Sequence, residues 1–203
     1  MSIVVFIRHG QTDWNTKNLT QGRENIPLNQ KGIDQAIKAS ADLKHSLEKT
    51  GFKFNKIFSS PLCRALDTAK MIADAIGNTP VIVDQRLIER DFGNLSGTYY
   101  DKNSPTVLRD TSDPTVETKQ SLIERVNSLI KDEVGMNENV LFVTHGAITR
   151  IYAMNAKKSD AVSKNEIGIM GNCSLVVYSY DGNEPILIGY DIAPKNFNAQ
   201  ELL

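Results

Sequence analysis

The stretch VVFIRHGQTDWN, residues 4–15, places four apolar residues directly before an arginine, a histidine and a glycine. A second stretch, NVLFVTHGAI at residues 139–148, repeats the order of an apolar run, a histidine and a glycine. These stretches hold His9 and His145, two of the three histidines in the chain. The carboxyl ends of parallel strands share one edge of a sheet, where open α/β folds bind ligands, so we expect both histidines at that edge. The third, His45, lies in the polar part of a predicted helix and is expected to have no role in a site.

Short β-branched runs alternate with helical patterns along the chain, which is typical of an α/β domain with a mostly parallel sheet. The predicted strands cover residues 3–7, 56–59, 81–83, 140–144 and 175–178, with 186–190 as a last strand at the edge of the sheet. Two predicted helices cover residues 30–48, before Gly51, and residues 119–134, where apolar side chains share one face.

The clearest helical pattern runs from Leu62 to Ile76, where apolar residues recur at three- and four-residue spacing. Ser60 and Pro61 ahead of it predict a capped first turn, and Gly77 predicts its end.

Residues 98–116, TYYDKNSPTVLRDTSDPTV, contain two prolines and few periodic apolar positions. This composition predicts a long loop or lid rather than part of the core. With 203 residues, of which 40% are hydrophobic, we expect one domain over residues 1–203 that carries this lid.

Charge and composition exclude several classes of protein. A formal net charge of −1 gives no general attraction to nucleic acid or to acidic membranes. No apolar run approaches the ~20 residues of a transmembrane helix, and the start MSIVVFIRHG lacks the features of a signal peptide. Two cysteines without CxxC spacing are typical of a reducing compartment. We therefore expect a soluble, cytoplasmic protein with no nucleic-acid or membrane partner.

The residues around the paired histidines favour a phosphate over a metal ion. Zinc and similar ions need a third or fourth ligand at a recognisable spacing, and the sequence has neither HxH nor HExxH. Arg8 stands directly before His9, and a guanidinium repels a cation and attracts an oxyanion. Arg64 lies on a predicted strand-to-helix turn, where its side chain and the free N–H groups of the helix can point toward the same edge. Gly10 and Gly146 after the two histidines let the backbone approach a ligand closely.

Four blocks of the sequence together resemble the histidine phosphatase superfamily, also called the phosphoglycerate mutase-like family. In the order of the family they are RHGQTDWN (8–15), SSPLCRALDTA (59–69), IERDFGNLSG (88–97) and VTHGAITR (143–150). The resemblance implies a three-layer α/β fold with a mostly parallel central sheet and helices on both faces. It also implies phosphoryl transfer through a phosphohistidine, with no metal ion and no other cofactor.

Carried over position by position, the resemblance implies that His9 is the nucleophile and that Glu89 donates a proton to the leaving oxygen. The residues it implies as holders of the phosphate oxygens are Arg8, Asn15, Arg64 and His145. A neutral imidazole is a good nucleophile near pH 7, and two guanidiniums can neutralise the charge on the oxygens during transfer.

The segment LTQGRENIPLNQKG, residues 19–32, resembles a second loop of the family and implies that Gln21 and Gly22 lie near the substrate. Gly146 in the fourth block is implied as a further substrate contact. Two positions depart from the family pattern. Asn25 stands where an aspartate is common, and Glu117 lies in TVET, which resembles the Gly-Glu-Ser element of the family but lacks its glycines.

The family contains mutases, which return the phosphoryl group to a substrate, and phosphatases, which pass it to water. His145 follows Glu89 by 56 residues, a shorter distance than in the cofactor-dependent phosphoglycerate mutases with their elaborated insertion. The paired arginines that those mutases use for the substrate carboxylate are not visible, because Arg109 is the only arginine between Arg90 and Arg125. We therefore expect a phosphomonoester hydrolase that acts on small organic phosphates.

Two alternatives remain at this point: a cofactor-dependent phosphoglycerate mutase, and a non-catalytic protein that binds phosphate ligands on the same fold. Tyr99, Tyr100 and Leu108 would make a partly apolar lid that suits a range of organic phosphates. We expect the ligand to be a small phosphate ester and the chain to act as a monomer or homodimer.

Overall fold

The computed structural model describes residues 1–100, 112–160, 162, 167–198 and 201. Its described strands form one sheet in the order β3-β2-β4-β1-β6-β7-β5. The strands are β1 (Ser2–Arg8), β2 (Lys56–Ser59), β3 (Val81–Val83), β4 (Val140–Thr144), β5 (Lys157–Lys158), β6 (Leu175–Tyr180) and β7 (Ile186–Ile192). Strands β3, β2, β4 and β1 pair in parallel, while β6 is antiparallel to both β1 and β7. The expected mostly parallel sheet is confirmed.

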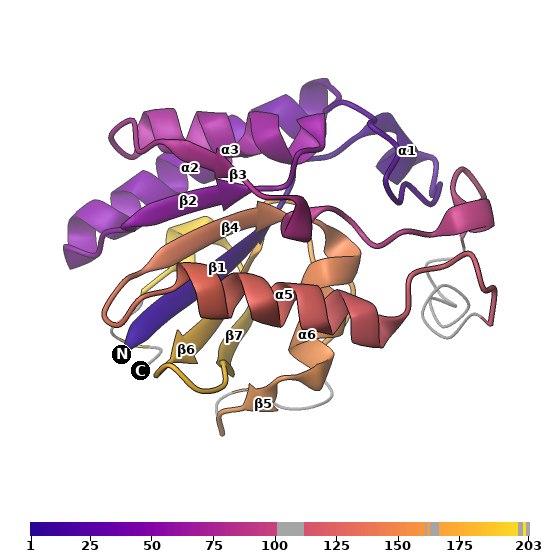
Figure 1. The fold of residues 1–203 in the computed structure, drawn as a ribbon. Helices are drawn as coiled ribbons and strands as arrows, with labels where there is room; N and C mark the ends of the chain where they lie inside the picture. Colours follow the sequence, from indigo (N-terminus) through magenta and orange to yellow (C-terminus); the bar gives the residue numbers. More distant parts are fainter. Residues whose placement is uncertain (101–111, 161, 163–166, 199–200, 202–203) are drawn as a thin grey trace.

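Helices cover both faces of this sheet. α2 (Gln30–Thr50) and α3 (Cys63–Ala75) lie on one face, and α5 (Lys119–Glu133) and α6 (Gly146–Asn155) lie on the other (Figure 1). A short α1 (Asp13–Thr16) follows β1, and short 3-10 turns occur at η1 (Gln85–Leu87), η2 (Gly93–Leu95) and η4 (Pro194–Asn196). The three-layer α/β fold is therefore confirmed.

The uninterrupted apolar run of β1 is explained by burial on both faces. Side chains of a strand alternate between the two faces, so Val5 and Ile7 join the core under α2 and α3, while Val4 and Phe6 join the core under α5 and α6. All four side chains are at most 1% exposed. Strand β1 is thus fixed from both sides, and its carboxyl end is a rigid place for a functional side chain.

Two glycines allow α2 to begin close to the end of β1. A side chain at Gly10 would collide with the carbonyl oxygen of Gly32, and a side chain at Gly32 would collide with the carbonyl oxygen of Gln11. The contacts of Gly10 show that it makes room for the first turn of α2. The start of α2 is further held by Asn29, whose side chain accepts a hydrogen bond from the backbone N–H of Gly32 at 2.8 Å.

Three details of the sequence-based fold were wrong. The expected edge strand, β7, is bordered by β5, whose two residues pair with Ile186 and Leu187. Helix α6, directly after the second histidine, was not predicted. Ser60 was expected to cap α3, but the N-cap position is Leu62, which makes no side-chain cap bond.

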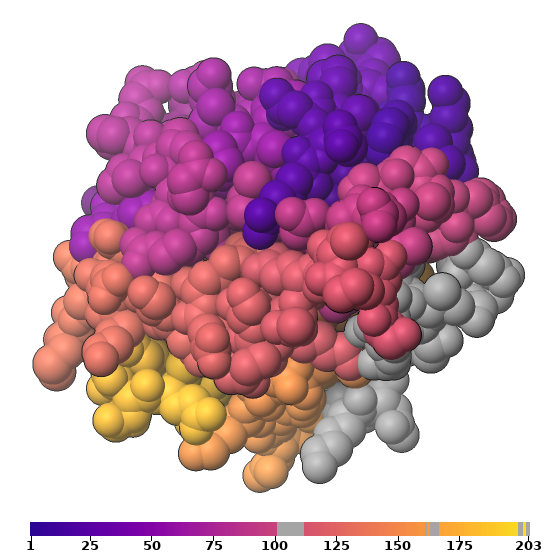
Figure 2. All heavy atoms as spheres, turned by 45° about the vertical axis from the view of Figure 1, so that its right-hand side comes forward, coloured from indigo at the N-terminus to yellow at the C-terminus, as the bar shows by residue number. Residues whose placement is uncertain are grey.

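The expected lid at 98–116 falls largely on residues 101–111, which lie outside the described residues, as does Leu108. Its beginning is attached to the loop after α1, since the N–H of Thr20 donates to Thr98 and the N–H of Tyr100 donates to Asn18, at 2.8 and 2.9 Å. In Figure 2 the indigo N-terminal segment and the magenta segment that precedes residue 100 meet at the surface in this way. None of the helices in the described part of the chain is long and apolar enough to cross a bilayer.

Candidate active site

His9 stands at the carboxyl end of β1 and is 2% exposed. Its backbone N–H donates to the carbonyl of Thr144 at 2.9 Å, and its carbonyl accepts from Asn172 Nδ2 at 2.9 Å. Its ring Nδ1 lies 2.6 Å from the carbonyl oxygen of Gly10. A carbonyl can only accept, so Nδ1 carries the proton and Nε2 of the neutral ring presents a lone pair. The atom of His9 that is available for bond formation is therefore Nε2.

Arg64, in the first turn of α3, is fully buried and donates from Nε to His9 Nε2 at 3.2 Å. Its two terminal nitrogens donate to backbone carbonyls of the loop before α2, Nη1 to Glu24 at 2.6 Å and Nη2 to Gly22 at 2.8 Å. Burial lowers the pKa of Arg64 to about 10, which still leaves the guanidinium charged at neutral pH. A rigid cation is thus held beside the lone pair of His9.

The ionisation of His9 follows from this environment. Burial, followed by the charges of Arg64 and Arg8, lowers the pKa of His9 well below its usual value of 6.5. The ring is neutral at physiological pH, which is the form that can act as a nucleophile.

Arg8 is anchored at one end only. Its Nη1 donates to the carbonyl of Met170 at 2.6 Å, while its buried Nε has no hydrogen-bond partner in the described part of the chain. Gly146 makes room for this guanidinium, because a Cβ there would lie 3.3 Å from Arg8 Nε. A buried donor without a partner is costly in a protein, so this nitrogen is suited to receive a ligand oxygen.

His145 precedes α6, and its ring meets that of His9 edge to face with centroids 5.1 Å apart. The structure thus brings the two histidines together at one edge of the sheet, where the sequence predicts both. Ring Nε2 lies 2.7 Å from Ser60 Oγ, and the buried Nδ1 has no partner among the described residues. Burial and the charge of Arg64 lower the pKa of His145 well below 6.5, so this ring is also neutral at pH 7.

Glu89 lies just after η1 and is 7% exposed. One carboxylate oxygen accepts from the N–H of Arg90 at 2.8 Å and the other from the N–H of Ala147 at 3.2 Å. Burial raises the pKa of Glu89 in spite of these two hydrogen bonds. A carboxyl group that holds its proton more strongly than usual is suited to general acid catalysis.

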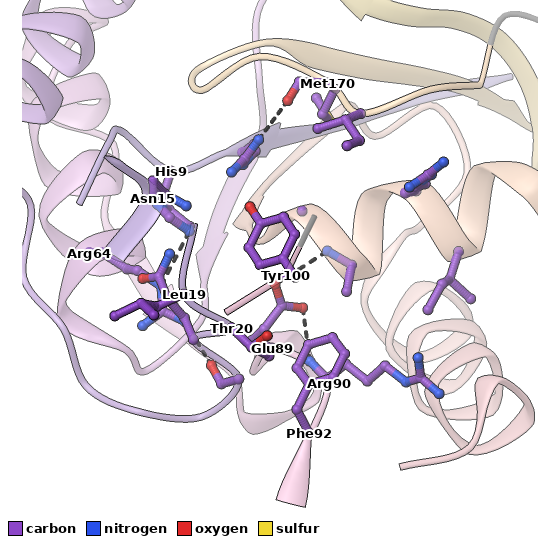
Figure 3. Close-up of a pocket in the computed structure, with 18 residues that line it drawn as sticks. His9, Asn15, Leu19, Thr20, Arg64, Glu89, Arg90, Phe92, Tyr100 and Met170 are labelled. Atoms are coloured by element: carbon purple, nitrogen blue, oxygen red, sulfur yellow. Dashed lines mark hydrogen bonds between the residues drawn. The ribbon is translucent and has the colours of Figure 1, made fainter. Parts of the chain in front are cut away.

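Eight of the nine residues to which the resemblance gives a catalytic or substrate-binding role line one pocket, and His145 is the ninth. The eight are Arg8, His9, Asn15, Gln21, Gly22, Arg64, Glu89 and Gly146. Figure 3 shows His9, Asn15 and Arg64 on one side of this pocket and Glu89, Arg90 and Phe92 on another. Thr12 links Asn15 to Gln21. Its backbone N–H and its hydroxyl both lie within hydrogen-bonding distance of Asn15 Oδ1, and the hydroxyl also lies 3.0 Å from Gln21 Oε1.

The two positions that depart from the family pattern lie outside the pocket lining. Glu117 is largely buried and pairs with Arg125 at 2.7 Å and with Arg23 at 3.6 Å. Asn25 lies at the start of α3, where its Oδ1 accepts from the N–H of Cys63 at 2.8 Å. Both residues therefore support the segments that surround the pocket.

Sequence reasoning missed several residues of the pocket. Thr20, Arg90 and Arg150 line it and fall within the sequence blocks that carry the family resemblance, which was the available signal. Ile169 and Met170 also line it but come from a segment with no motif. In the described part of the chain, no group of three or more His, Cys, Asp or Glu side chains is placed to hold a metal ion.

A family model described as "Histidine phosphatase superfamily (branch 1)" matches residues 4–192. The chain belongs to the histidine phosphatase superfamily.

Histidine phosphatases similar to this chain include both enzyme types. A "2,3-bisphosphoglycerate-dependent phosphoglycerate mutase" from Mesorhizobium japonicum is 34% identical over 183 residues, which cover 81% of this chain and 87% of the relative. An "Uncharacterized phosphatase PhoE" from Bacillus subtilis is 34% identical over 149 residues, which cover 72% and 73%.

Among solved structures, a mycobacterial glucosyl-3-phosphoglycerate phosphatase in complex with VO3 superimposes with a TM-score of 0.75 at 26% identity. The superposition covers 94% of this chain and 98% of that one. Members of the superfamily are enzymes, either phosphatases or mutases.

Proposed function

We propose that this histidine phosphatase hydrolyses phosphomonoesters of small organic molecules through a phosphohistidine on His9. The observation that carries the proposal is the convergence of one lone pair and two free donors. His9 Nε2 presents its lone pair beside Arg64, while Arg8 Nε and His145 Nδ1 are buried and lack a partner among the described residues. The phosphorus of a phosphoryl group would be the electrophile for the lone pair of His9, and its oxygens would accept hydrogen bonds from Arg8 Nε and His145 Nδ1.

The first chemical step would transfer the phosphoryl group to the protein. The lone pair of His9 Nε2 leaves its hydrogen bond with Arg64 Nε and forms a bond to phosphorus while the ester P–O bond breaks, and the carboxyl proton of Glu89 passes to the leaving oxygen. The guanidiniums of Arg8 and Arg64 offset the charge on the phosphoryl oxygens.

The second step would reverse the role of Glu89. Its carboxylate takes a proton from an incoming water while the water oxygen bonds to phosphorus. The P–N bond breaks, its electron pair returns to His9 Nε2, and inorganic phosphate leaves. Neither step draws on a metal ion or an organic cofactor.

Hydrolysis is favoured over mutase action by the apolar part of the pocket lining. This part includes the side chains of Leu19, Phe92, Ile151, Ile169 and Met170. Such a wall suits the carbon skeleton of a monoester, whereas a bisphosphorylated substrate needs cations at both ends. The similarity to two proteins named as phosphatases is consistent with this preference.

A phosphoglycerate mutase is the second candidate. It is favoured by the relative from M. japonicum that carries this name and by the presence of Arg90 and Arg150 in the pocket lining, where they could meet a second anionic group. The presence and proximity of the residues that the resemblance implies in catalysis speak against the non-catalytic binding protein.

The test is a direct comparison of the two reactions in the presence of EDTA. Phosphate release is measured on a panel of sugar, amino-acid, nucleotide and aryl phosphates, and interconversion of 3- and 2-phosphoglycerate is measured with 2,3-bisphosphoglycerate added. We expect phosphate release from at least one ester to exceed the interconversion, with no loss of activity in EDTA. Faster interconversion would assign the chain to the mutases, a loss in EDTA restored by zinc or magnesium would contradict the metal-free mechanism, and no turnover at all would leave a binding protein.

A further inference from the structure

Ser60 lies where β2 pairs with β4, the strand that precedes His145. It follows β2, its side chain is fully buried, and its backbone N–H donates to the carbonyl of Val143 in β4 at 3.0 Å. Its hydroxyl lies 2.7 Å from Nε2 of His145, which follows the last residue of β4. The serine is therefore fixed on the same strand that positions the ring it contacts.

The hydrogen bonds of the Ser60 hydroxyl limit which way the proton between it and His145 lies. A hydroxyl has one hydrogen to donate and two lone pairs that accept. One lone pair is occupied, because the backbone N–H of Leu62 donates to Ser60 Oγ at 3.3 Å. The hydrogen needs an acceptor, and His145 Nε2 is the acceptor at hydrogen-bonding distance.

The two tautomers of a neutral His145 differ in what they leave unsatisfied. With the proton on Nε2, the ring donates to Ser60, the hydroxyl hydrogen loses this acceptor, and Nδ1 becomes a bare acceptor facing a site that binds an anion. With the proton on Nδ1, Nε2 accepts from Ser60, and the free group is an N–H donor. Only the second arrangement places on the buried Nδ1 a hydrogen that a phosphoryl oxygen can accept.

We propose that Ser60 is a positioning residue that fixes His145 in the Nδ1–H tautomer, so that a neutral donor faces the phosphoryl group on His9. The inference rests on the proposed function, because the phosphoryl group of that reaction supplies the oxygen that accepts from His145 Nδ1–H. Ser60 touches neither substrate nor the reacting atoms.

The chain offers a matched control in the neighbouring residue. Ser59 is equally buried, but its hydroxyl donates to the carbonyl oxygen of Ser60 at 2.9 Å. Ser59→Ala and Ser60→Ala remove the same atom from adjacent positions in β2 and the turn after it. Ser60→Cys keeps a side chain of similar size with a weaker donor.

The experiment combines steady-state kinetics with NMR of protein labelled with 15N in the histidine rings. We expect Ser60→Ala to lower kcat by roughly 10- to 100-fold with little change in KM, which is the effect of losing one hydrogen bond to the charged phosphoryl group. The kcat of Ser60→Cys should lie between the values of wild type and Ser60→Ala. Ser59→Ala should keep kcat within about threefold of wild type. In the spectra His145, assigned with His45→Gln and His145→Gln variants, should show a protonated Nδ1 and an unprotonated Nε2 in wild type and a mixture of tautomers in Ser60→Ala.

A wild-type His145 protonated on Nε2 would overturn the inference, and this measurement does not depend on whether Ser60→Ala folds. An unchanged tautomer and unchanged kcat in Ser60→Ala would overturn it as well. Failure of the proposed function looks different, since the wild-type protein would then show the expected tautomer but turn over no phosphate ester.

Discussion

Glu89 combines two opposing influences on one carboxyl group. Burial raises its pKa, while the hydrogen bonds from Arg90 and Ala147 lower it, and burial is the larger effect. A dianionic phosphate beside the carboxylate would raise the pKa further, because like charges disfavour ionisation. The group is therefore expected to be protonated when an ester is bound.

Replacing Glu89 by glutamine separates proton donation from nucleophilic attack. An alkoxide leaves only when it is protonated, whereas an aryl oxide leaves with little help. Glu89→Gln should therefore slow alkyl phosphates by ~10²–10⁴ and slow aryl phosphates far less. Phosphate release from one ester of each type gives the two ratios, and equal slowing of both esters would show that Glu89 is not the acid.

Gly146 provides a second prediction at the level of one residue. A methyl group there would lie 3.3 Å from Arg8 Nε and 3.5 Å from its Cζ, which forces the guanidinium to move. We expect Gly146→Ala to lower kcat/KM for every ester by about 10-fold or more, as for a lost charge-assisted hydrogen bond. Gly168→Ala is the control, because a Cβ at Gly168 meets no atom within 4 Å. Equal effects of the two changes would mean that Arg8 does not depend on this space.

At the level of elements, the site depends on how the loop before α2 attaches to α3. The carbonyls of Gly22 and Glu24 accept hydrogen bonds from the terminal nitrogens of Arg64. Asn25 Oδ1 accepts from the N–H of Cys63 in the first turn of α3. Asn25 thereby acts as a cap supplied from another segment. Hydrogen bonds thus hold the loop that contains Asn25 against Arg64 and the first turn of α3.

Removing this cap should destabilise the protein measurably. Asn25→Ala leaves the N–H of Cys63 without its acceptor, at a cost of about 0.5–2 kcal/mol in the free energy of unfolding. Asn25→Asp, which restores the residue common in the family, keeps the acceptor and adds a negative charge at the helix N-terminus, a gain of about 0.3–1 kcal/mol. Urea unfolding of the three proteins checks the order, and Asn25→Ala equal to wild type would contradict it.

The elements that the sequence predicts are those with a strong local pattern. The apolar runs of β1 and β4 and the stripe of α3 decide their own structure, because each is buried on the faces that the pattern describes. Strand β5 is two lysines, which carry no strand signal and pair only because β7 lies beside them. Ser60 follows the local rule for a cap, but the N-cap position is Leu62, and Ser60 Oγ accepts a hydrogen bond from the N–H of Leu62 instead.

The pocket shows the same division. His9, His145 and Arg64 end or follow strands with clear patterns, so their proximity follows from the topology of a parallel sheet. The carbonyl of Met170 accepts from Arg8, but Met170 lies in a loop whose position depends on tertiary contacts. No periodicity in the sequence indicates this contact.

At the scale of the whole molecule, the site links stability to pH. His9 and His145 are buried in neutral form with lowered pKa values, so the unfolded chain binds more protons than the folded chain below about pH 6.5. Stability should therefore fall as the pH drops below this value. Glu89 has a raised pKa and acts in the opposite direction above its ordinary value of 4.5, where the folded chain holds the extra proton.

The size of this effect is predicted from proton counting. With two histidines the free energy of unfolding should fall by up to about 2.7 kcal/mol per pH unit below pH 6.5, less the contribution of Glu89. His145→Gln should reduce the slope by up to about 1.4 kcal/mol per pH unit, and Glu89→Gln should steepen it. Urea unfolding between pH 5 and 7.5 measures the slopes, and a stability that rises toward acid would contradict the neutral state of both rings.

The phosphorylated enzyme itself tests the central claim most directly. Glu89→Gln is treated with a 32P-labelled aryl phosphate, whose leaving group departs without an acid, while the missing base slows hydrolysis of the phosphohistidine. We predict label on the protein that is stable to alkali, labile to acid and located on His9, with none in His9→Asn. Label on another residue, or turnover that persists in His9→Asn, would contradict His9 as the nucleophile.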